Sequence, residues 1–243
     1  MACTQHSCTT SNRQLALAVV FACESHKFQT RKSLCLDPLD GRKKHPAYIV
    51  HPARVMCIVM DMIDWPVFEQ HQRGGDVKPT KDEIMIAALL HDVVEDTSST
   101  YDDIKNQFGA TIANLVQECT FVSGDEGLST SDIKKDNVER AKTMSDAARV
   151  IKMADMRDNL SDLLSNPPPG WSAKRVQGYF IWKREVMKYN RGLPGTTRLV
   201  ECIDALMEDG EFKHSDGNTY RALPRGDDVD YAKLLQEYYA MFL

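Results

Sequence analysis

The residues best suited to chemistry form one short stretch, His91-Asp92-Val93-Val94-Glu95-Asp96-Thr97. A histidine and the aspartate next to it can bind one metal ion from neighbouring positions. On a helix, Glu95 lies one turn beyond His91 and Asp96 lies one turn beyond Asp92, so these side chains share one side. Three carboxylates this close oppose folding unless a cation or a substrate compensates them. The stretch therefore predicts a metal site with acid–base groups beside it.

A complete site needs further ligands, and the chain offers His51 and Asp155 at two distant places. The order His…His-Asp…Asp resembles the ligand set of the HD phosphohydrolase superfamily. The finer pattern is similar to the hydrolase domain of the Rel/SpoT alarmone enzymes, and most of all to their small stand-alone members, over roughly residues 13 to 212. The matching segments are His26–Lys32, Tyr48–Pro52, Ala87–Thr97, Lys152–Asp155 and Gly170–Ser172.

The resemblance implies that His51, His91, Asp92 and Asp155 hold one divalent metal ion, and it favours Mn²⁺. Two imidazoles with two carboxylates suit a borderline divalent metal and leave positions open for water and phosphate. The spacing alone does not distinguish manganese from iron, zinc or cobalt. For a single residue of the set, the alternative is a buried or capping polar side chain.

The resemblance assigns catalysis to Glu95 and Asp96. Carboxylates beside the metal would orient a water that attacks phosphorus and would pass a proton to the leaving oxygen. The alternative is a solvated acidic helix end. Carboxylates at a helix C-terminus oppose the helix dipole, which makes this alternative costly.

Six further residues match positions that contact the nucleotide in the family: Arg31, Lys32, Ser33, Asn159, Arg175 and Tyr179. An arginine fork and a lysine charge can bind a polyphosphate, and the arginine can also stack on a base. Asn159 lies one helical turn after Asp155, so both would face the same cavity. The alternatives are a solvated basic loop, a surface asparagine and a tyrosine packed in the core, where Trp171, Phe180 and Trp182 are also expected.

The predicted fold is all-α, an HD-domain helical bundle with room for one small β-hairpin between Leu34 and Ile49. Helical periodicity recurs along the chain, and Thr80 with Glu83 has the spacing of a capping box. We expect residues 1–212 to form the metal-dependent phosphohydrolase domain. Residues 213–243 would be an extension ending in an amphipathic helix from Tyr231, which could pack on the domain or support a homo-oligomer.

Net charge, apolar runs and cysteine spacing disfavour several classes of partner and location. A net charge of −5 on 243 residues disfavours a duplex nucleic acid as partner, because phosphate binding needs a basic surface. No apolar run is long enough to cross a membrane, and no secretory signal is evident. The seven cysteines form no CxxC pair, which favours reduced thiols and the cytoplasm. Four of them, Cys23, Cys57, Cys119 and Cys202, are expected in the core.

The sequence thus predicts an enzyme that cleaves guanosine tetra- or pentaphosphate to GDP or GTP and pyrophosphate. A first alternative is removal of the 2′-phosphate of NADPH, and a second is hydrolysis of an adenosine alarmone. A third is a partner that neutralises an alarmone-making toxin. Phe28, which replaces a glycine common in the family, and the enlarged loop at 33–47 could alter the substrate preference.

Overall fold

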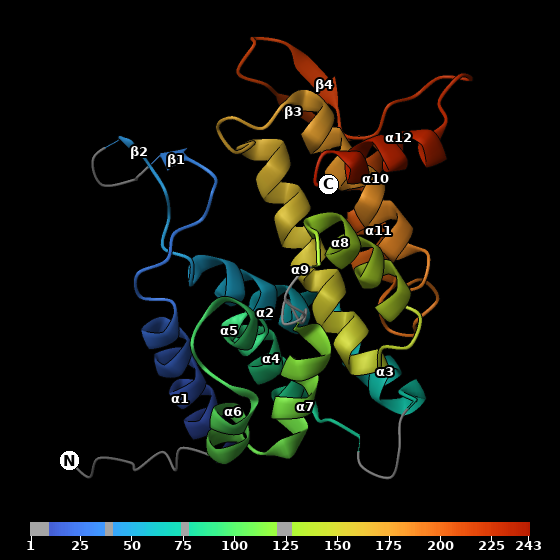
Figure 1. Ribbon diagram of the computed structural model, residues 1–243. Helices are drawn as coiled ribbons and strands as arrows, with labels where there is room; N and C mark the ends of the chain where they lie inside the picture. The colour runs from blue at the N-terminus through green and yellow to red at the C-terminus, as the bar shows by residue number, and fades with distance from the viewer. Residues whose placement is uncertain (1–9, 37–40, 74–77, 121–127) are drawn as a thin grey trace, which may run out of the picture.

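The computed structural model describes residues 10–36, 41–73, 78–120 and 128–243, and helices dominate them (Figure 1). The helices are α1 (Thr10–Ser25), α2 (Val50–Met62), α3 (Trp65–His71), α4 (Lys81–Leu90), α5 (Val93–Asp96), α6 (Tyr101–Phe108), α7 (Ala110–Cys119), α8 (Thr130–Arg140), α9 (Asp146–Ser165), α10 (Ala173–Met187), α11 (Thr197–Glu208) and α12 (Tyr231–Ala240). The strands are β1 (Cys35–Leu36), β2 (Lys43–Lys44), β3 (Glu211–Lys213) and β4 (Thr219–Arg221). The predicted all-α class is confirmed.

Helix α9 runs through the middle of the bundle and packs against α2, α4, α7 and α11 (Figure 1). Its central residues are buried on every side, including Asp155 and Asp158. Helix α4 is likewise buried from Ile84 to Leu90, and it begins at the predicted capping box. The Glu83 backbone N–H donates to the Thr80 hydroxyl at 3.3 Å, while the Glu83 carboxylate accepts from the Thr80 backbone N–H at 2.8 Å. Two buried helices therefore carry the expected ligands into the interior.

Two antiparallel hairpins extend from the bundle. The first pairs β1 with β2, in register Cys35↔Lys44, inside the predicted segment. The second, β3 with β4, was not predicted, although Gly217 takes a positive φ of 89° that suits a tight turn. Strand β3 crosses the expected domain boundary after residue 212, and Phe212 is buried. The division at that point remains a prediction.

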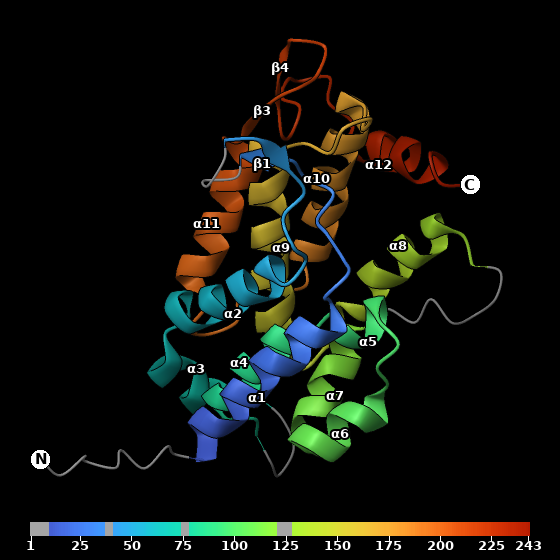
Figure 2. The ribbon, with the colours of Figure 1, turned by 90° about the vertical axis from the view of Figure 1, so that its left-hand side faces the viewer.

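The final helix, α12, packs on α10 and α8 of the same chain (Figure 2). Its Tyr238 ring lies against Gly178, where an added Cβ would stand 2.3 Å from the Tyr238 Cδ2 atom. Only glycine leaves room for this contact. The packing of the extension on the domain is therefore confirmed, whereas self-association through α12 remains a prediction.

The expectation that four cysteines lie in the core was wrong for three of them. Cys23 and Cys57 are exposed and Cys202 is half-buried, so only Cys119 of the four lies in the core. Each exposed cysteine lies on the solvent side of an amphipathic helix, one position from the buried face formed by residues such as Ala22 and Ile58. No helix in the described part of the chain has the length and apolarity needed to span a membrane.

Candidate active site

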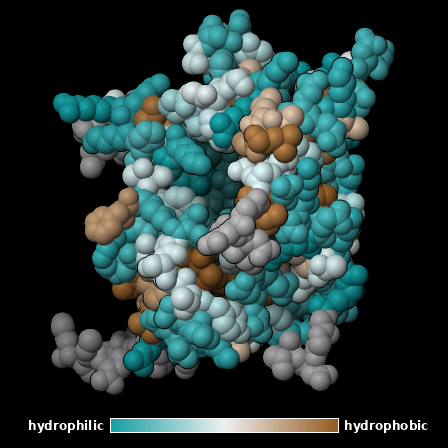
Figure 3. Space-filling view, in the orientation of Figure 1, coloured by the Kyte–Doolittle hydropathy of each residue, from teal (hydrophilic) through white to brown (hydrophobic). Residues whose placement is uncertain are grey.

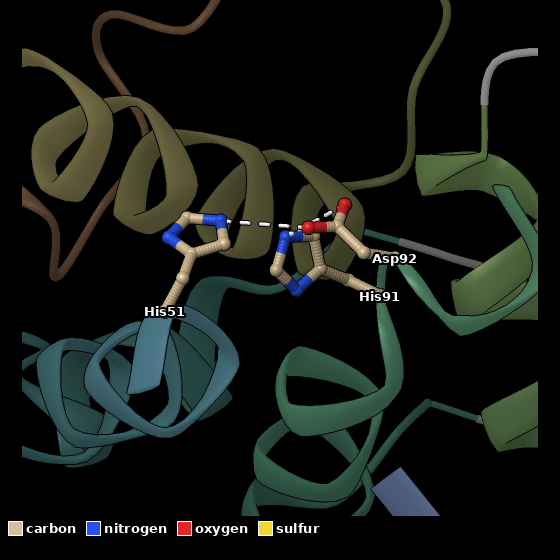
Figure 4. A group of neighbouring side chains, drawn as sticks. All are labelled: His51, His91 and Asp92. Carbon is tan, nitrogen blue, oxygen red and sulfur yellow. Dashed lines mark ion pairs between the residues drawn. The ribbon is translucent and has the colours of Figure 1, made fainter. Parts of the chain in front are cut away.

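Three elements bring the predicted metal ligands together. His51 lies in the first turn of α2, His91 and Asp92 follow α4, and Asp155 lies midway along α9. The His51 Nε2 atom is 3.5 Å from Asp92 Oδ2 and 3.2 Å from Asp155 Oδ1. The His91 Nε2 atom is 3.1 Å from Asp92 Oδ1 and 3.8 Å from Asp155 Oδ1. Figure 4 shows the two imidazoles converging with the Asp92 carboxylate.

The donor set fits a divalent metal. One ligand atom from each of His51, His91 and Asp92 lies within 4.8 Å of the other two. The His91 Nε2 atom is buried without a hydrogen-bond partner, while its Nδ1 atom lies 2.7 Å from the Ala88 carbonyl. The His51 Nδ1 atom lies 2.7 Å from a carboxylate oxygen of Asp158. Both Nε2 atoms are therefore oriented toward one point, as metal-binding imidazoles are.

Electrostatics favour a cation at that point. Burial alone would lower the pKa of His51, but hydrogen bonds with Asp155 and Asp158 outweigh it and raise the pKa to about 10. Burial also lowers the pKa of His91, but the charge of Asp92 helps to outweigh it, and the pKa is raised to about 9. The pKa of Asp92 and that of Asp155 are held well below the usual range, against burial, mainly by His91 and Lys152 respectively. The two carboxylates thus favour positive charge at this point, and a bound divalent metal ion would supply it.

Two positioning residues were missed in the sequence. The Asp158 carboxylate lies 2.7 Å from His51 Nδ1 and accepts a hydrogen bond of 2.7 Å from Arg54 Nε. Asp158 is three residues after Asp155 and Arg54 is three after His51, so helical spacing was the available signal. The chain Arg54–Asp158–His51 fixes the ring orientation, a role that carboxylates often have behind a metal-binding histidine.

The two acid–base candidates lie on α5, directly after the ligands. Glu95 is half-buried and Asp96 is more exposed. The Tyr48 hydroxyl lies 2.7 Å from Asp92 Oδ2 and 2.7 Å from Asp96 Oδ2. Burial and the Asp92 charge raise the pKa of Asp96. Tyr48, which sequence reasoning did not select, therefore connects a metal-ligand candidate to a proton-transfer candidate.

A pocket of about 440 Å³ adjoins these groups, a size that suits a small ligand. Figure 3 shows a hollow with hydrophilic surroundings over α2 and α9. Five of the six predicted nucleotide-binding residues line the pocket: Arg31, Lys32, Ser33, Asn159 and Tyr179. Trp171, which was expected in the core, lines it as well and is only half-buried.

A hydrogen-bond network ties the pocket wall to α9. The Arg31 guanidinium donates to Asn159 Oδ1 at 2.7 Å and to Asp162 Oδ2 at 3.1 Å, and the Ser33 hydroxyl donates to Asp162 at 3.0 Å. The Asn159 amide donates in turn to Asp155. Asp162, seven residues after Asp155, was missed, although it shares that helix face. The network fixes the loop side chains relative to the metal ligands.

Arg175 does not line this pocket. Its guanidinium carbon lies 4.3 Å from the Trp171 ring centroid and 5.3 Å from that of Phe242. Arg175 was predicted to contact the nucleotide, but it lies behind Trp171 and under the C-terminal segment. The sequence could not show this, because Phe242 lies outside the family resemblance.

Comparisons with known proteins agree with this geometry. The HD domain family matches residues 76–178. The guanosine-3′,5′-bis(diphosphate) 3′-pyrophosphohydrolase MESH1 of Danio rerio is 38% identical over 191 residues, covering 79% of this chain and 90% of the relative. The protein of the same description from Homo sapiens is 38% identical and covers 77% of this chain and 89% of the relative. A solved structure reported as "A metazoan ortholog of SpoT hydrolyzes ppGpp and plays a role in starvation responses" aligns with a TM-score of 0.64 at 30% identity, over 81% of this chain and 94% of that one.

Proposed function

The chain belongs to the HD-domain family that includes the MESH1 hydrolases, and from this premise we propose that it hydrolyses guanosine 3′,5′-bis(diphosphate) at the 3′ position. Water adds to the phosphorus that is bonded to the 3′ oxygen, and the bond between this phosphorus and the 3′ oxygen breaks. The 3′ oxygen takes up a proton, so the products are GDP and pyrophosphate. Guanosine pentaphosphate would give GTP in the same way.

One observation carries the proposal: the predicted metal ligands converge beside a pocket of nucleotide size. The Nε2 atom of His91, which is buried and makes no hydrogen bond, supports a metal ion there, and the relatives support a bis(diphosphate) substrate. We propose Mn²⁺ as the ion, with His51, His91, Asp92 and Asp155 as its ligands. Such an ion supplies Lewis-acid activation of water and of the phosphoryl group when bound.

The residues of the chain would bind the nucleotide and move protons. Glu95 would accept a proton from the attacking water, and Asp96, whose pKa is raised, would deliver one to the 3′ oxygen. Tyr48 would hold Asp96 in place through its hydroxyl. Arg31 and Lys32 would bind the nucleotide along the pocket wall, where Arg31 already lies 2.7 Å from Asn159.

Ser33, Asn159 and Tyr179 would complete the nucleotide contacts in the pocket, and Arg175 would act from behind Trp171. A cytoplasmic location and self-association through α12 remain predictions that belong to the same proposal.

The test is hydrolysis of guanosine tetraphosphate by the purified full chain, with and without Mn²⁺, with products separated by anion-exchange chromatography. We expect GDP and pyrophosphate only when metal is present. NADPH and an adenosine alarmone serve as competing substrates at equal concentration. Failure to cleave the guanosine compound, together with cleavage of either competitor, would refute the assignment.

A further inference from the structure

A half-buried lysine on α8, Lys134, and a buried lysine on α10, Lys183, approach the same aromatic rings. The Lys134 Nζ atom lies 3.9 Å from the centroid of a Trp182 ring, and the Lys183 Nζ atom lies 4.2 Å from a Trp182 ring centroid. Both also lie near Tyr179, at 5.7 Å and 5.4 Å respectively. The two ammonium groups therefore share two aromatic neighbours, and Lys183 is only 5% exposed. The Lys183 charge disfavours a second positive charge on Lys134, because like charges repel.

The C-terminal segment closes this cluster from outside. The Lys134 Nζ atom lies 5.2 Å from the Tyr238 ring and 5.1 Å from the Phe242 ring. Phe242 also covers the Arg175 guanidinium. We call Lys134, Lys183 and Arg175 the cation cluster. Aromatic faces attract its charges, yet they supply no negative charge to neutralise them.

Within the described residues, no carboxylate forms an ion pair or a hydrogen bond with any member of the cation cluster. The Nε atom of Arg175 is buried without a partner, and so is the hydroxyl of Tyr238. Burial, together with the neighbouring cations, lowers the pKa of Lys134 to about 7. Burial lowers the pKa of Lys183 to about 8, although the negative charges of Asp155, Glu95 and Asp92 act to raise it. The charges that act on Lys134 are all positive, and the Arg175 Nε atom has no partner. Cations that are removed from water without a counter-charge are costly, so these two groups indicate that an anionic ligand completes the cluster.

The cation cluster adjoins the pocket through two aromatic side chains. Trp171 and Tyr179 line the pocket, and their rings lie next to Arg175 and Lys183 respectively. Lys32, also in the pocket, lies close enough that its charge acts on Lys134. Asp155, one of the proposed metal ligands, raises the pKa of Lys183 through its charge. A phosphate chain that extends from the proposed metal ligands past the Tyr179 ring would reach this cluster.

We propose that the cation cluster is an anion subsite for the terminal phosphate of the diphosphate that is cleaved off, and that α12 forms its outer wall. The inference rests on the proposed function and specifies its substrate class. A ribose 3′-diphosphate reaches both the metal ligands and the subsite. A ribose monophosphate, such as the 2′-phosphate of NADPH, reaches only the metal ligands. Lys183 would therefore determine specificity for a diphosphate over a monophosphate.

The experiment compares Lys183→Met with Lys188→Met in the metal-loaded full chain. Lys188, at the end of α10, pairs with Glu185 at 2.6 Å and lies outside the cluster, so it serves as the matched control. The substrates are guanosine tetraphosphate and the matching guanosine 5′-diphosphate 3′-monophosphate. In Lys183→Met we expect kcat/KM for the 3′-diphosphate to fall about tenfold, the loss of one charge-assisted hydrogen bond, with little change for the monophosphate. Inhibition by inorganic pyrophosphate should weaken by a similar factor.

A purely structural lysine gives a different pattern. Lys183→Met would then lower thermal stability and reduce kcat/KM equally for both substrates, and this result would overturn the proposal. In our proposal the melting temperature stays constant or rises, because a repelling charge is removed. Calorimetric binding of inorganic pyrophosphate separates the two hypotheses. Binding that depends on Lys183 in a chain that cleaves neither guanosine compound would refute the proposed function and keep the subsite, whereas binding independent of Lys183 and Lys134 would refute the subsite.

Discussion

The two sides of the pocket balance charge in opposite ways. On the α2–α9 side, each charged group that we describe has a counter-charge within the chain, as Asp158 has in Arg54 at 2.7 Å and Asp162 has in Arg31 at 3.1 Å. On the α8–α10 side, Lys134 and Lys183 both lie against Trp182 and have aromatic rings as their neighbours.

The difference indicates which side is preformed. A hydrogen-bonded network of opposite charges holds its geometry without a ligand. The α2–α9 side, which we call the metal side because it carries the proposed metal ligands, should therefore be rigid before substrate binds. On the α8–α10 side, which we call the cation side, the charges that act on Lys134 are all positive, so this group gains a counter-charge only when an anion arrives. Substitutions on the metal side should therefore abolish chemistry, whereas those on the cation side should alter selectivity and pH response.

The largest effect should follow Asp155→Asn, which removes a charge from the metal side. We expect the chain to lose most of its bound metal and at least about a thousandfold in kcat, because Lewis-acid activation is worth several kcal/mol. Metal content by mass spectrometry and turnover of guanosine tetraphosphate measure both. Asp146→Asn, on the same helix but paired with Arg73, is the matched control and should keep its metal. Full turnover by Asp155→Asn would remove this residue from the ligand set.

A smaller loss should follow Asp96→Asn. An amide cannot deliver a proton, so kcat should fall about a hundredfold while the bound metal remains. The exposed Asp102 on α6 provides the control, and Asp102→Asn should behave as the parent chain. Loss of metal together with activity would show instead that Asp96 acts by holding Tyr48 and Asp92 in place.

Asp158→Asn should weaken the metal side without removing a ligand. The amide keeps the shape but loses the charge that orients His51, so metal affinity should fall by ten- to a hundredfold, as is typical for such partners. Titration with Mn²⁺ while activity is monitored measures the change, and excess metal should restore turnover. An unchanged affinity would mean that packing alone orients the His51 ring.

The resemblance was sufficient to predict that His51, His91, Asp92 and Asp155 would meet, and the elements that carry them could be recognised because they are local and periodic. The capping box places the start of α4, and the apolar run from Ile84 to Leu90 leads directly to His91. Helical spacing within α9 would also have identified Asp158, had the spacing been applied beyond Asp155 and Asn159. Side chains one turn apart on a buried helix face the same neighbours, so such partners can be found without a structure.

The cation side could not be predicted in this way. Lys134, Lys183 and Phe242 lie far apart in the sequence and meet only through the packing of α8, α10 and α12. Gly178 permits that packing by leaving space for Tyr238, yet nothing around a helical glycine in the sequence indicates which ring will occupy it. Contacts between segments distant in sequence depend on the assembled fold, and the extension also lies outside the family resemblance.

The smallest effect should be a change in the pH dependence of stability caused by Lys134→Met. The pKa of Lys134 is lowered to about 7 in the folded chain, whereas an unfolded lysine keeps a pKa of about 10.4. Between these values the unfolded state binds more protons, so Lys134 makes stability rise with pH from about 7 to about 10, and below pH 7 its full cost persists. The difference in free energy of unfolding between the parent chain and Lys134→Met, measured by denaturant titration, should therefore shift in favour of the parent as pH increases.

Lys188→Met is again the control, and its stability should keep the parent's dependence on pH. Pyrophosphate should reduce the slope of the parent chain, because an anion beside Lys134 favours its charged form. Parallel curves for Lys134→Met and the parent would mean that the faces of Trp182, Tyr238 and Phe242 already keep the lysine charged. The contrast between the two sides of the pocket would then lie in the kind of compensation, aromatic against ionic, and an anion would no longer be needed to explain the cluster.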